Sequence, residues 1–344
     1  MKRARPCGRP PWTHWRKSLW RSTSVTNGST PSNGLRFPTS SRARGCADEH
    51  CPDHPAIDRI EEPNLLAARS LLAPWWTSSV ALLRSIVRNR RLTIELSKRE
   101  LLDRYTGQLF GSAWAILHPA LTVLVFLFFF GEVLKVKVGG AHLPANNDFT
   151  IYLLSGLLPW LVLQDVLTRG STLVVNNAHL VKQVAFPLDV LPIKAIPPAF
   201  VILLVGLLLL IVYTLMTTFA LPATYLVLPL LLAELILLCV GIALFLSALG
   251  VFIRDLKDIV QVFSFVGVYV SPIFYTIDTV PAKLRALVFL NPFTPIILTF
   301  QDVLFYGSFA HPWAWVVSIV LSVAALLIGA RVFNTTQHYF GSYL

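Results

Sequence analysis

The sequence predicts an all-α integral membrane protein, and three observations carry that prediction. Of its 344 residues, 55% are hydrophobic and 14% are charged, whereas a soluble domain is about half apolar and a quarter charged. The mean hydropathy of the whole chain is +0.63. The apolar residues also stand in uninterrupted runs of about 20 residues, the length that a helix needs to cross a hydrocarbon core. A bilayer is therefore the expected solvent.

Residues 1–83 are predicted to be a basic, disordered N-terminal extension. The first 60 residues are rich in Arg, Pro, Ser and Trp, lack apolar periodicity, and contain no apolar core of a signal peptide. Two alternatives stay open: contact with anionic lipid through the Arg and Trp side chains, and a translation start inside the chain. The group Cys46, His50, Cys51 and His54 raises the question of zinc, but its spacing matches no standard site, so no metal is expected.

Residues 84–111 are predicted to form an amphipathic helix on the membrane surface, with Arg99, Arg104 and Tyr105 at the interface. Apolar side chains fall on one face of a 3.6-residue helix, at Ile94, Leu101, Leu102, Tyr105 and Leu109. On the polar side, the spacing predicts the i,i+4 ion pairs Glu95–Arg99 and Glu100–Arg104.

Residues 112–334 are predicted to form a domain of six transmembrane helices. The predicted spans cover about 112–131, 149–167, 195–219, 225–253, 259–275 and 313–333. Between the last two spans, residues 281–311 are too broken by proline for further spans and too apolar for a free loop. We expect short re-entrant helices there, dipping into the outer leaflet with their broken backbone buried in protein. Residues 335–344 are expected to be a cytoplasmic tail.

The formal net charge of +11 is concentrated outside the apolar runs. Lys and Arg mark the cytoplasmic side of a membrane protein, so the charge indicates orientation and contact with lipid, not nucleic acid. Seven basic residues precede the first span: Arg84, Arg88, Arg90, Arg91, Lys98, Arg99 and Arg104. Both chain ends and the loops at 168–190 and 254–258 are therefore expected in the cytoplasm.

The loop at 176–191 has the pattern of a docking helix. Asn176 or Asn177 is suited to cap a helix, which would run from His179 to Phe186 and stop at Pro187. Leu180, Val184 and Phe186 would give this helix an apolar surface in water. We expect it to bind a partner; the alternative is an ordinary connection between spans.

Four residues are candidates for a translocation path. Glu234 lies inside an apolar span, where a carboxyl is costly unless it faces protein or water, or reaches the interface. Tyr269, Phe274 and Tyr275 end the predicted fifth span, where aromatic rings either stack on sugars or form the aromatic belt of the interface.

Six short passages in order across residues 100–333 resemble the transmembrane subunit of type-2 ABC exporters, in the branch that exports polysaccharides such as O-antigen, capsule and teichoic acid. The passages are Arg104-Tyr105-Thr106-Gly107, Leu109 to Trp114 with Pro119, Leu154 to Trp160, Asn177 to Pro187, Arg254-Asp255, and Ser271 to Phe293. Residues 1–80 have no counterpart in the family.

The resemblance implies a transport subunit, not an enzyme, in the cytoplasmic (inner) membrane. The sequence has no G-x-x-x-x-G-K-[ST] phosphate loop, so ATP and Mg would belong to a separate ABC-type ATPase, with two permease copies in the complex. A lipid-linked glycan would be the cargo. The implied contacts with the ATPase are Asn177, Leu180, Val181, Lys182, Phe186, Pro187, Arg254 and Asp255.

Three alternatives to polysaccharide export stay open. The same kind of exporter could carry a drug or a lipo-oligosaccharide. A polytopic glycan-modifying enzyme would need charged residues gathered in an outer loop, and here they are scattered. A secondary transporter would need several acidic residues inside the membrane, and only Glu234 is found there. Arg254 and Asp255 have an alternative of their own, since they can simply mark the membrane interface.

Overall fold

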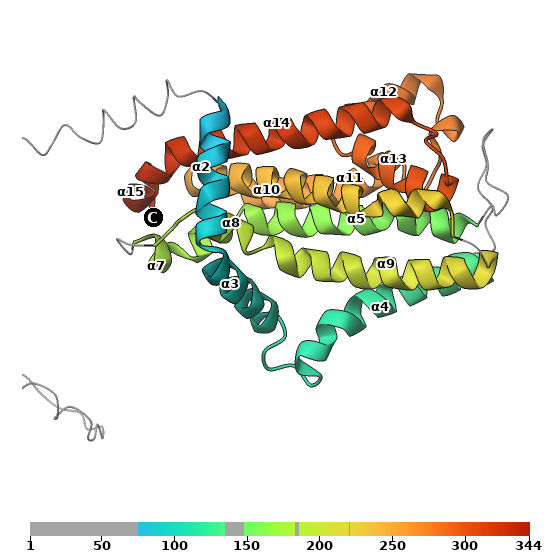
Figure 1. Ribbon diagram of the computed structural model, residues 1–344, viewed down its shortest axis with the longest axis horizontal. Helices are drawn as coiled ribbons and strands as arrows, with labels where there is room; N and C mark the ends of the chain where they lie inside the picture. Colours follow the sequence, from blue (N-terminus) through green and yellow to red (C-terminus); the bar gives the residue numbers. More distant parts are fainter. Residues whose placement is uncertain (1–74, 135–147, 183–185, 220) are drawn as a thin grey trace, which may run out of the picture. The chain divides into compact units, whose positions relative to one another are not determined.

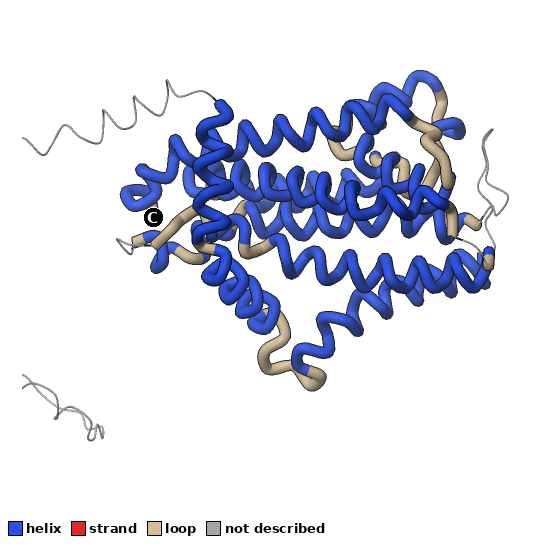
Figure 2. Tube along the Cα trace, in the orientation of Figure 1, coloured by secondary structure: helices blue, strands red, loops and turns tan. Residues whose placement is uncertain are grey.

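The computed structural model describes residues 75–134, 148–182, 186–219 and 221–344, and these residues form helices joined by short loops (Figure 2). Predictions made for residues 1–74, including the zinc question, lie outside the described residues. So do Val184 and the loop at 135–147.

Within the described residues, five segments are helical, long and apolar enough to cross a membrane, and they confirm the all-α membrane fold. They are Gly111–Leu134 (η1, α4 and the π-helix η2), Phe149–Gly170 (α5), Val190–Thr218 (α8 and α9), Ala223–Phe252 (η3 and α10) and Pro312–Tyr343 (α14, η6 and α15). Each overlaps one of the predicted spans, because a run of about 20 apolar residues is itself the signal of a span.

The predicted fifth span is shorter than expected. It is helical only over α11, Leu256–Val270, whose 15 residues measure about 22 Å at 1.5 Å per residue. The chain then turns at Ser271-Pro272, where proline cannot continue a helix. Two short pieces follow, α12 (Ala282–Leu290) and Thr294–Tyr306 (α13 with η5), bent by 100° at their junction. This sharp bend agrees with the re-entrant pair predicted from the prolines.

The core of the bundle is made by α5, α10 and the buried α13, Thr294–Gln301. α10 packs against both α14 and α5, and α5 packs against α9, Ile196–Thr218 (Figure 1). α10 and α14 approach closely through glycines: a Cβ added to Gly329 would lie 2.1 Å from the Gly241 carbonyl oxygen. Small residues of this kind let helix backbones touch in a membrane. α4, Trp114–Phe126, contributes little to this core and buries only Ala115, Pro119 and Val123 among its residues.

The N-terminal helices differ from the single surface helix predicted for 84–111. Two helices, α2 (Trp75–Arg88) and α3 (Arg90–Asp103), meet at Asn89. α2 packs against α14 (Figure 1). Its Leu82 is 1% exposed in a cluster with Phe333 and Phe340. The C-terminal residues are likewise more than a tail, because α15 (Phe340–Tyr343) places Phe340 in this core.

Candidate functional site

One end of the bundle gathers most of the predicted contact residues, and we call it the basic end. α5 and α10 finish there: the Ser247 hydroxyl donates a 3.0 Å hydrogen bond to the Gly170 carbonyl. A Cβ on Gly250 would lie 2.1 Å from the Ser171 carbonyl oxygen. The loops that follow α5 and α10, at 171–189 and 253–255, therefore leave the bundle at the same end, as their shared basic character predicted.

The predicted docking helix is shorter than expected. The described turns are α6 (Leu173–Asn176) and α7 (Ala178–Val181), each of four residues. α7 ends at Val181 and Phe186 is not helical, so the described part of the predicted helix, from His179 to Phe186, is helical only as far as Val181. Asn177 precedes α7 without capping it through its side chain. Its Nδ2 instead donates to the Leu173 carbonyl at 2.7 Å, and its Oδ1 accepts a hydrogen bond from Lys194. Both polar atoms of the Asn177 side chain therefore form hydrogen bonds other than a cap on α7.

The apolar side chains of this loop face its own bundle more than water. Leu180, Val181 and Phe186 are half-buried against a cluster that contains Leu191 and Ala195. Beyond them Pro187 is also half-buried, whereas Val175, His179 and Lys182 are exposed. The Lys182 Nζ donates to the Leu344 backbone carbonyl at 3.1 Å. The loop is therefore anchored by its apolar side and presents a polar and partly apolar surface outward.

Lys194, at the start of the third span, is the most buried cation at the basic end, with 8% of its side chain exposed. Its Nζ lies 3.1 Å from Glu100 Oε2 and donates to Asn177 Oδ1, also at 3.1 Å. A buried charge is tolerated when it is paired and hydrogen-bonded. Lys194 consequently ties the loop before α7 to α3.

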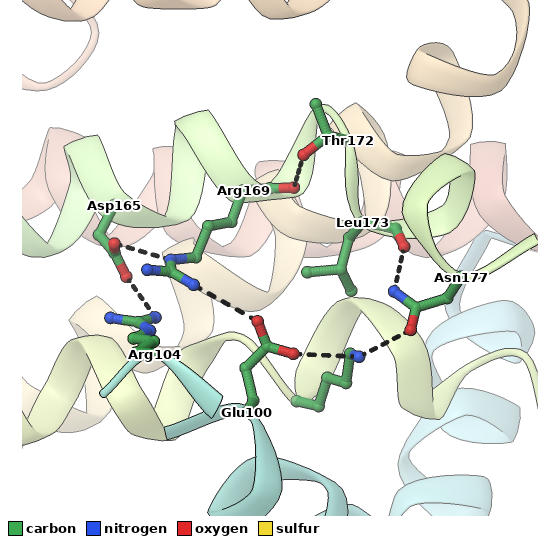
Figure 3. A network of polar contacts seen from close by, with 8 residues as sticks. Glu100, Arg104, Asp165, Arg169, Thr172, Leu173 and Asn177 are labelled. Carbon is green, nitrogen blue, oxygen red and sulfur yellow. Dashed lines mark hydrogen bonds and ion pairs between the residues drawn. The ribbon is translucent and has the colours of Figure 1, made fainter. Parts of the chain in front are cut away.

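The same chain of ion pairs continues onto α5. Arg169 donates to Glu100 Oε1 at 3.4 Å and to Asp165 Oδ1 at 2.8 Å, and Arg104 donates to Asp165 Oδ2 at 3.1 Å (Figure 3). Two guanidinium groups thus share one carboxylate. Burial is the main cause that lowers the pKa of Arg104. The nearby Asp165 carboxylate raises this pKa, and the Arg169 cation lowers it further. The Arg104 Nε is buried and has no hydrogen-bond partner among the residues that the structure describes.

The ion pairs predicted along the surface helix are wrong. Arg99 pairs with Asp103 at 3.7 Å and Glu95 with Lys98 at 3.6 Å, all four side chains being mostly exposed. Glu100 and Arg104 turn into the bundle instead. Exposed i,i+4 pairs contribute little, so the buried tertiary partners decide the arrangement. Ile94 and Leu102 remain exposed, as expected for a face that meets lipid, while the half-buried Tyr105 lies in the turn after α3.

A cavity of about 380 Å³ lies between α4 and α5, and we call it the α4–α5 slot. It exists because α4 packs against α9 and makes few contacts with α5. Its lining residues are His118, Pro119, Thr122, Val123, Leu154, Leu157, Leu158, Leu161, Gln164, Asp165, Thr168, Arg169 and Ile202. The sequence patterns did not predict this cavity, although its α5 residues recur at helical spacing and change from leucine to polar residues toward Gly170.

The remaining candidates fall into three places. Arg254 and Asp255 are exposed at the basic end, where a partner can reach them. Tyr269 and Phe274 stack with ring centroids 5.8 Å apart, and the adjacent Tyr275 hydroxyl donates to the Val270 carbonyl at 2.6 Å. These three aromatics are therefore neighbours, and their role stays a prediction.

Glu234 is apart from the aromatic group, on α10. It is 9% exposed and lies next to Ser318 of α14. One of its carboxyl oxygens has no hydrogen-bond partner in the part of the chain that the structure describes. The side chain is thus enclosed between two helices, and a role in translocation stays a prediction.

Residues 91–305 match the family model described as "ABC-2 type transporter". The chain belongs to this family. An ABC-2 type transporter is a membrane subunit for transport, not an enzyme, so the family predicted from the short sequence passages is confirmed, and the chain is a multi-pass membrane transport protein.

The chain is similar to several polysaccharide transport proteins over almost the whole length of those proteins. An O-antigen export system permease protein RfbA of Myxococcus xanthus is 25% identical over 264 residues, 76% of this chain and 98% of the relative. An RfbA of Klebsiella pneumoniae is 23% identical over 256 residues, 74% of this chain and 95% of the relative. The polysialic acid transport protein KpsM of Escherichia coli is 20% identical over 250 residues, 72% of this chain and 95% of the relative.

Proposed function

We propose that this ABC-2 transporter is the permease subunit of an exporter that moves a lipid-linked polysaccharide outward across the cytoplasmic membrane. The observation that carries the proposal is similarity along at least 95% of three relatives whose names specify O-antigen export or polysialic acid transport. The basic end, with Arg104, Arg169 and Lys194, is the cytoplasmic end by the distribution of positive charge.

A separate ABC-type ATPase supplies the energy, with ATP and Mg bound on that partner. Its docking surface on this chain comprises the loop from Asn177 to Pro187 and the exposed Arg254 and Asp255. Support comes from the position of both loops at one end of the bundle and from the outward-facing Val175 and Lys182. Leu180, Val181 and Phe186 act mainly from within, by holding the loop on the bundle.

The permease works as a homodimer in this proposal. The first span and α11 each leave apolar side chains exposed that packing within one chain does not cover. They include Leu124 of α4, Phe128 of η2, and Val262 and Phe265 of α11. A second copy covers some of these side chains, lipid covers the rest, and the glycan passes near the interface between the copies.

Movement of the ATPase is transmitted through the ion-pair chain. Asn177 lies in the docking loop, Lys194 joins it to Glu100 of α3, and Arg169 joins Glu100 to α5. These contacts connect three elements whose shift relative to one another would open or close the space between α4 and α5. Since the side chains are largely buried, a displacement of the loop is resisted by every contact in the chain.

Disruption of the gene in its host tests the proposed cargo. We expect long-chain polysaccharide to disappear from the cell surface and lipid-linked glycan to accumulate inside, both reversed by expression of this chain. Unchanged surface polysaccharide together with new drug sensitivity would favour the drug-exporter alternative. Polysaccharide that reaches the surface with altered structure would favour a glycan-modifying enzyme.

A further inference from the structure

The α4–α5 slot has a polarity gradient along its length. Its wall on α5 extends from Leu154 to Arg169, a distance of about 22 Å at 1.5 Å per residue. The part lined by Leu154, Leu157, Leu158 and Leu161 is apolar, and Val123 and Ile202 complete it from α4 and α9. Gln164, Asp165, Thr168 and Arg169 line the end nearest the basic end. The slot is therefore shaped for one elongated amphiphile, with its polar group at the basic end.

The charge at the polar end favours an anion. Asp165 is shared by Arg104 and Arg169, and Glu100 is shared by Arg169 and Lys194. Of these five groups, Asp165 and Arg169 line the slot, and the other three are their direct or indirect ion-pair partners outside its lining. Three cations thus meet two carboxylates, which leaves an excess of one positive charge. Arginine binds phosphate through charge-assisted hydrogen bonds, so a phosphate beside Arg169 would balance this excess.

We propose that the α4–α5 slot binds the lipid anchor of the cargo, with one hydrocarbon chain against the leucines of α5 and a phosphate beside Arg169. This inference rests on the proposed export of a lipid-linked glycan and specifies where that substrate is held. A cavity of about 380 Å³ is within the size range of small-molecule sites, about 300–1,000 Å³. Because its lining follows one helix from Leu154 to Arg169, it suits a single extended chain better than the paired chains of a bilayer phospholipid.

The probe for this site is farnesyl phosphate with a diazirine on its terminal isoprene unit. It is added to the full chain, in complex with its ATPase, in phosphatidylcholine nanodiscs without ATP. After irradiation, mass spectrometry locates the label and titration gives an apparent Kd. We expect saturable labelling of α4 or of the leucine-lined part of α5, and at least tenfold less labelling by the corresponding farnesol probe.

Two pairs of variants test the two halves of the slot. Leu161→Trp fills the apolar part, and we expect it to reduce labelling at least tenfold; Leu208→Trp, at an α9 position that is 62% exposed and outside the slot, is the matched control and should retain labelling. Thr168→Glu adds a negative charge at an exposed position of the polar end. We expect it to raise the Kd about fivefold relative to Thr168→Gln, because like charges separated by several ångströms near a membrane surface repel. Thermal unfolding of each variant verifies folding.

Several results would overturn the inference. Labels confined to other segments, equal labelling by farnesol, or unchanged Kd values in Leu161→Trp and Thr168→Glu would each exclude this binding mode. Competition by phosphatidylglycerol as effective as by unlabelled farnesyl phosphate would make the slot a general site for anionic lipid. An unlabelled slot in which Leu161→Trp disrupts the dimer would assign it to the second copy. Binding is measured without transport, so the two proposals can fail separately. If the chain exports glycan but the slot is not labelled, only the binding site in the slot is refuted. If the slot is labelled but no glycan is exported, only the proposed function is refuted.

Discussion

Removal of the contact between Glu100 and Lys194 should uncouple the ATPase from export without preventing assembly. Lys194 is 8% exposed, Glu100 is 25% exposed, and their charged atoms are 3.1 Å apart. Glu100→Gln leaves Lys194 with a neutral amide and with Asn177. Breaking a fully buried pair costs about 3–5 kcal/mol, and the partial exposure of Glu100 reduces our estimate to about 2 kcal/mol. Lys194→Met should cost about 1 kcal/mol, since Glu100 keeps Arg169 as a partner.

A double-mutant cycle separates the pair from its surroundings. The Glu100→Gln, Lys194→Met double variant should be less destabilised than the sum of the single variants, by about 1 kcal/mol, because neither change then leaves the other group unpaired. Glu95→Gln with Lys98→Met is the matched control on the same helix. These side chains are 72% and 66% exposed at 3.6 Å, and exposed pairs contribute less than about 1 kcal/mol.

The assay combines unfolding in detergent with transport in proteoliposomes. We expect Glu100→Gln to co-purify with the ATPase normally while glycan exported per ATP hydrolysed falls about fivefold, the lower range of a typical coupling free energy. The control pair should leave this ratio unchanged. The reasoning is refuted if Glu100→Gln lowers stability but keeps the parental ratio, since the pair would then be structural only, or if the cycle is additive.

Three further predictions follow from particular positions. Phe186→Asp should abolish co-purification with the ATPase, because a charge there would release the docking loop from the apolar cluster that holds it on the bundle. Phe186→Leu keeps an apolar side chain and should keep co-purification; parental pull-down by both would exclude this loop as the main contact. The orientation is tested by single cysteines in a chain whose native cysteines are replaced by serine. A cysteine at Ser308 should react with an impermeant maleimide outside the cell, and a cysteine at His179, which is exposed at the basic end, should not. The reverse labelling pattern would contradict the predicted orientation. Gly329→Ala should destabilise the chain by about 2 kcal/mol through overpacking, because the new Cβ would lie 2.1 Å from a backbone atom. Gly341→Ala is the control and should be tolerated, because nothing lies within 4 Å of that position. Equal melting temperatures of the two variants would contradict the close packing of α10 and α14.

The membrane fold was predictable because its signal is local. A run such as 195–219 contains in one stretch the length and polarity that a span needs. The ends of the spans were harder to predict from the sequence. α11 stops at Val270, five residues before the predicted end of the fifth span, because the apolar residues beyond Pro272 pack in a turn rather than in a helix. The family was predictable from short passages in the right order, each of them weak alone.

The polar contacts were not predictable, because they depend on tertiary neighbours. Sequence spacing paired Glu100 with Arg104, but folding brings Arg169 and Lys194 from 69 and 94 positions away to that glutamate. Asn177 has the right position for a helix cap, yet Lys194 recruits its side chain. The α4–α5 slot arises from the separation of two helices, and no property of either helix alone encodes that separation.

Reconstituted transport tests the central claim most directly. The chain and its ATPase are placed in proteoliposomes with a radiolabelled lipid-linked glycan from the host, and a glycosidase added on the side opposite the ATPase reports translocation. The account predicts glycan that becomes glycosidase-sensitive only when both subunits and hydrolysable ATP are present. Translocation without the ATPase, or none with the complete complex and a verified host glycan, would contradict it.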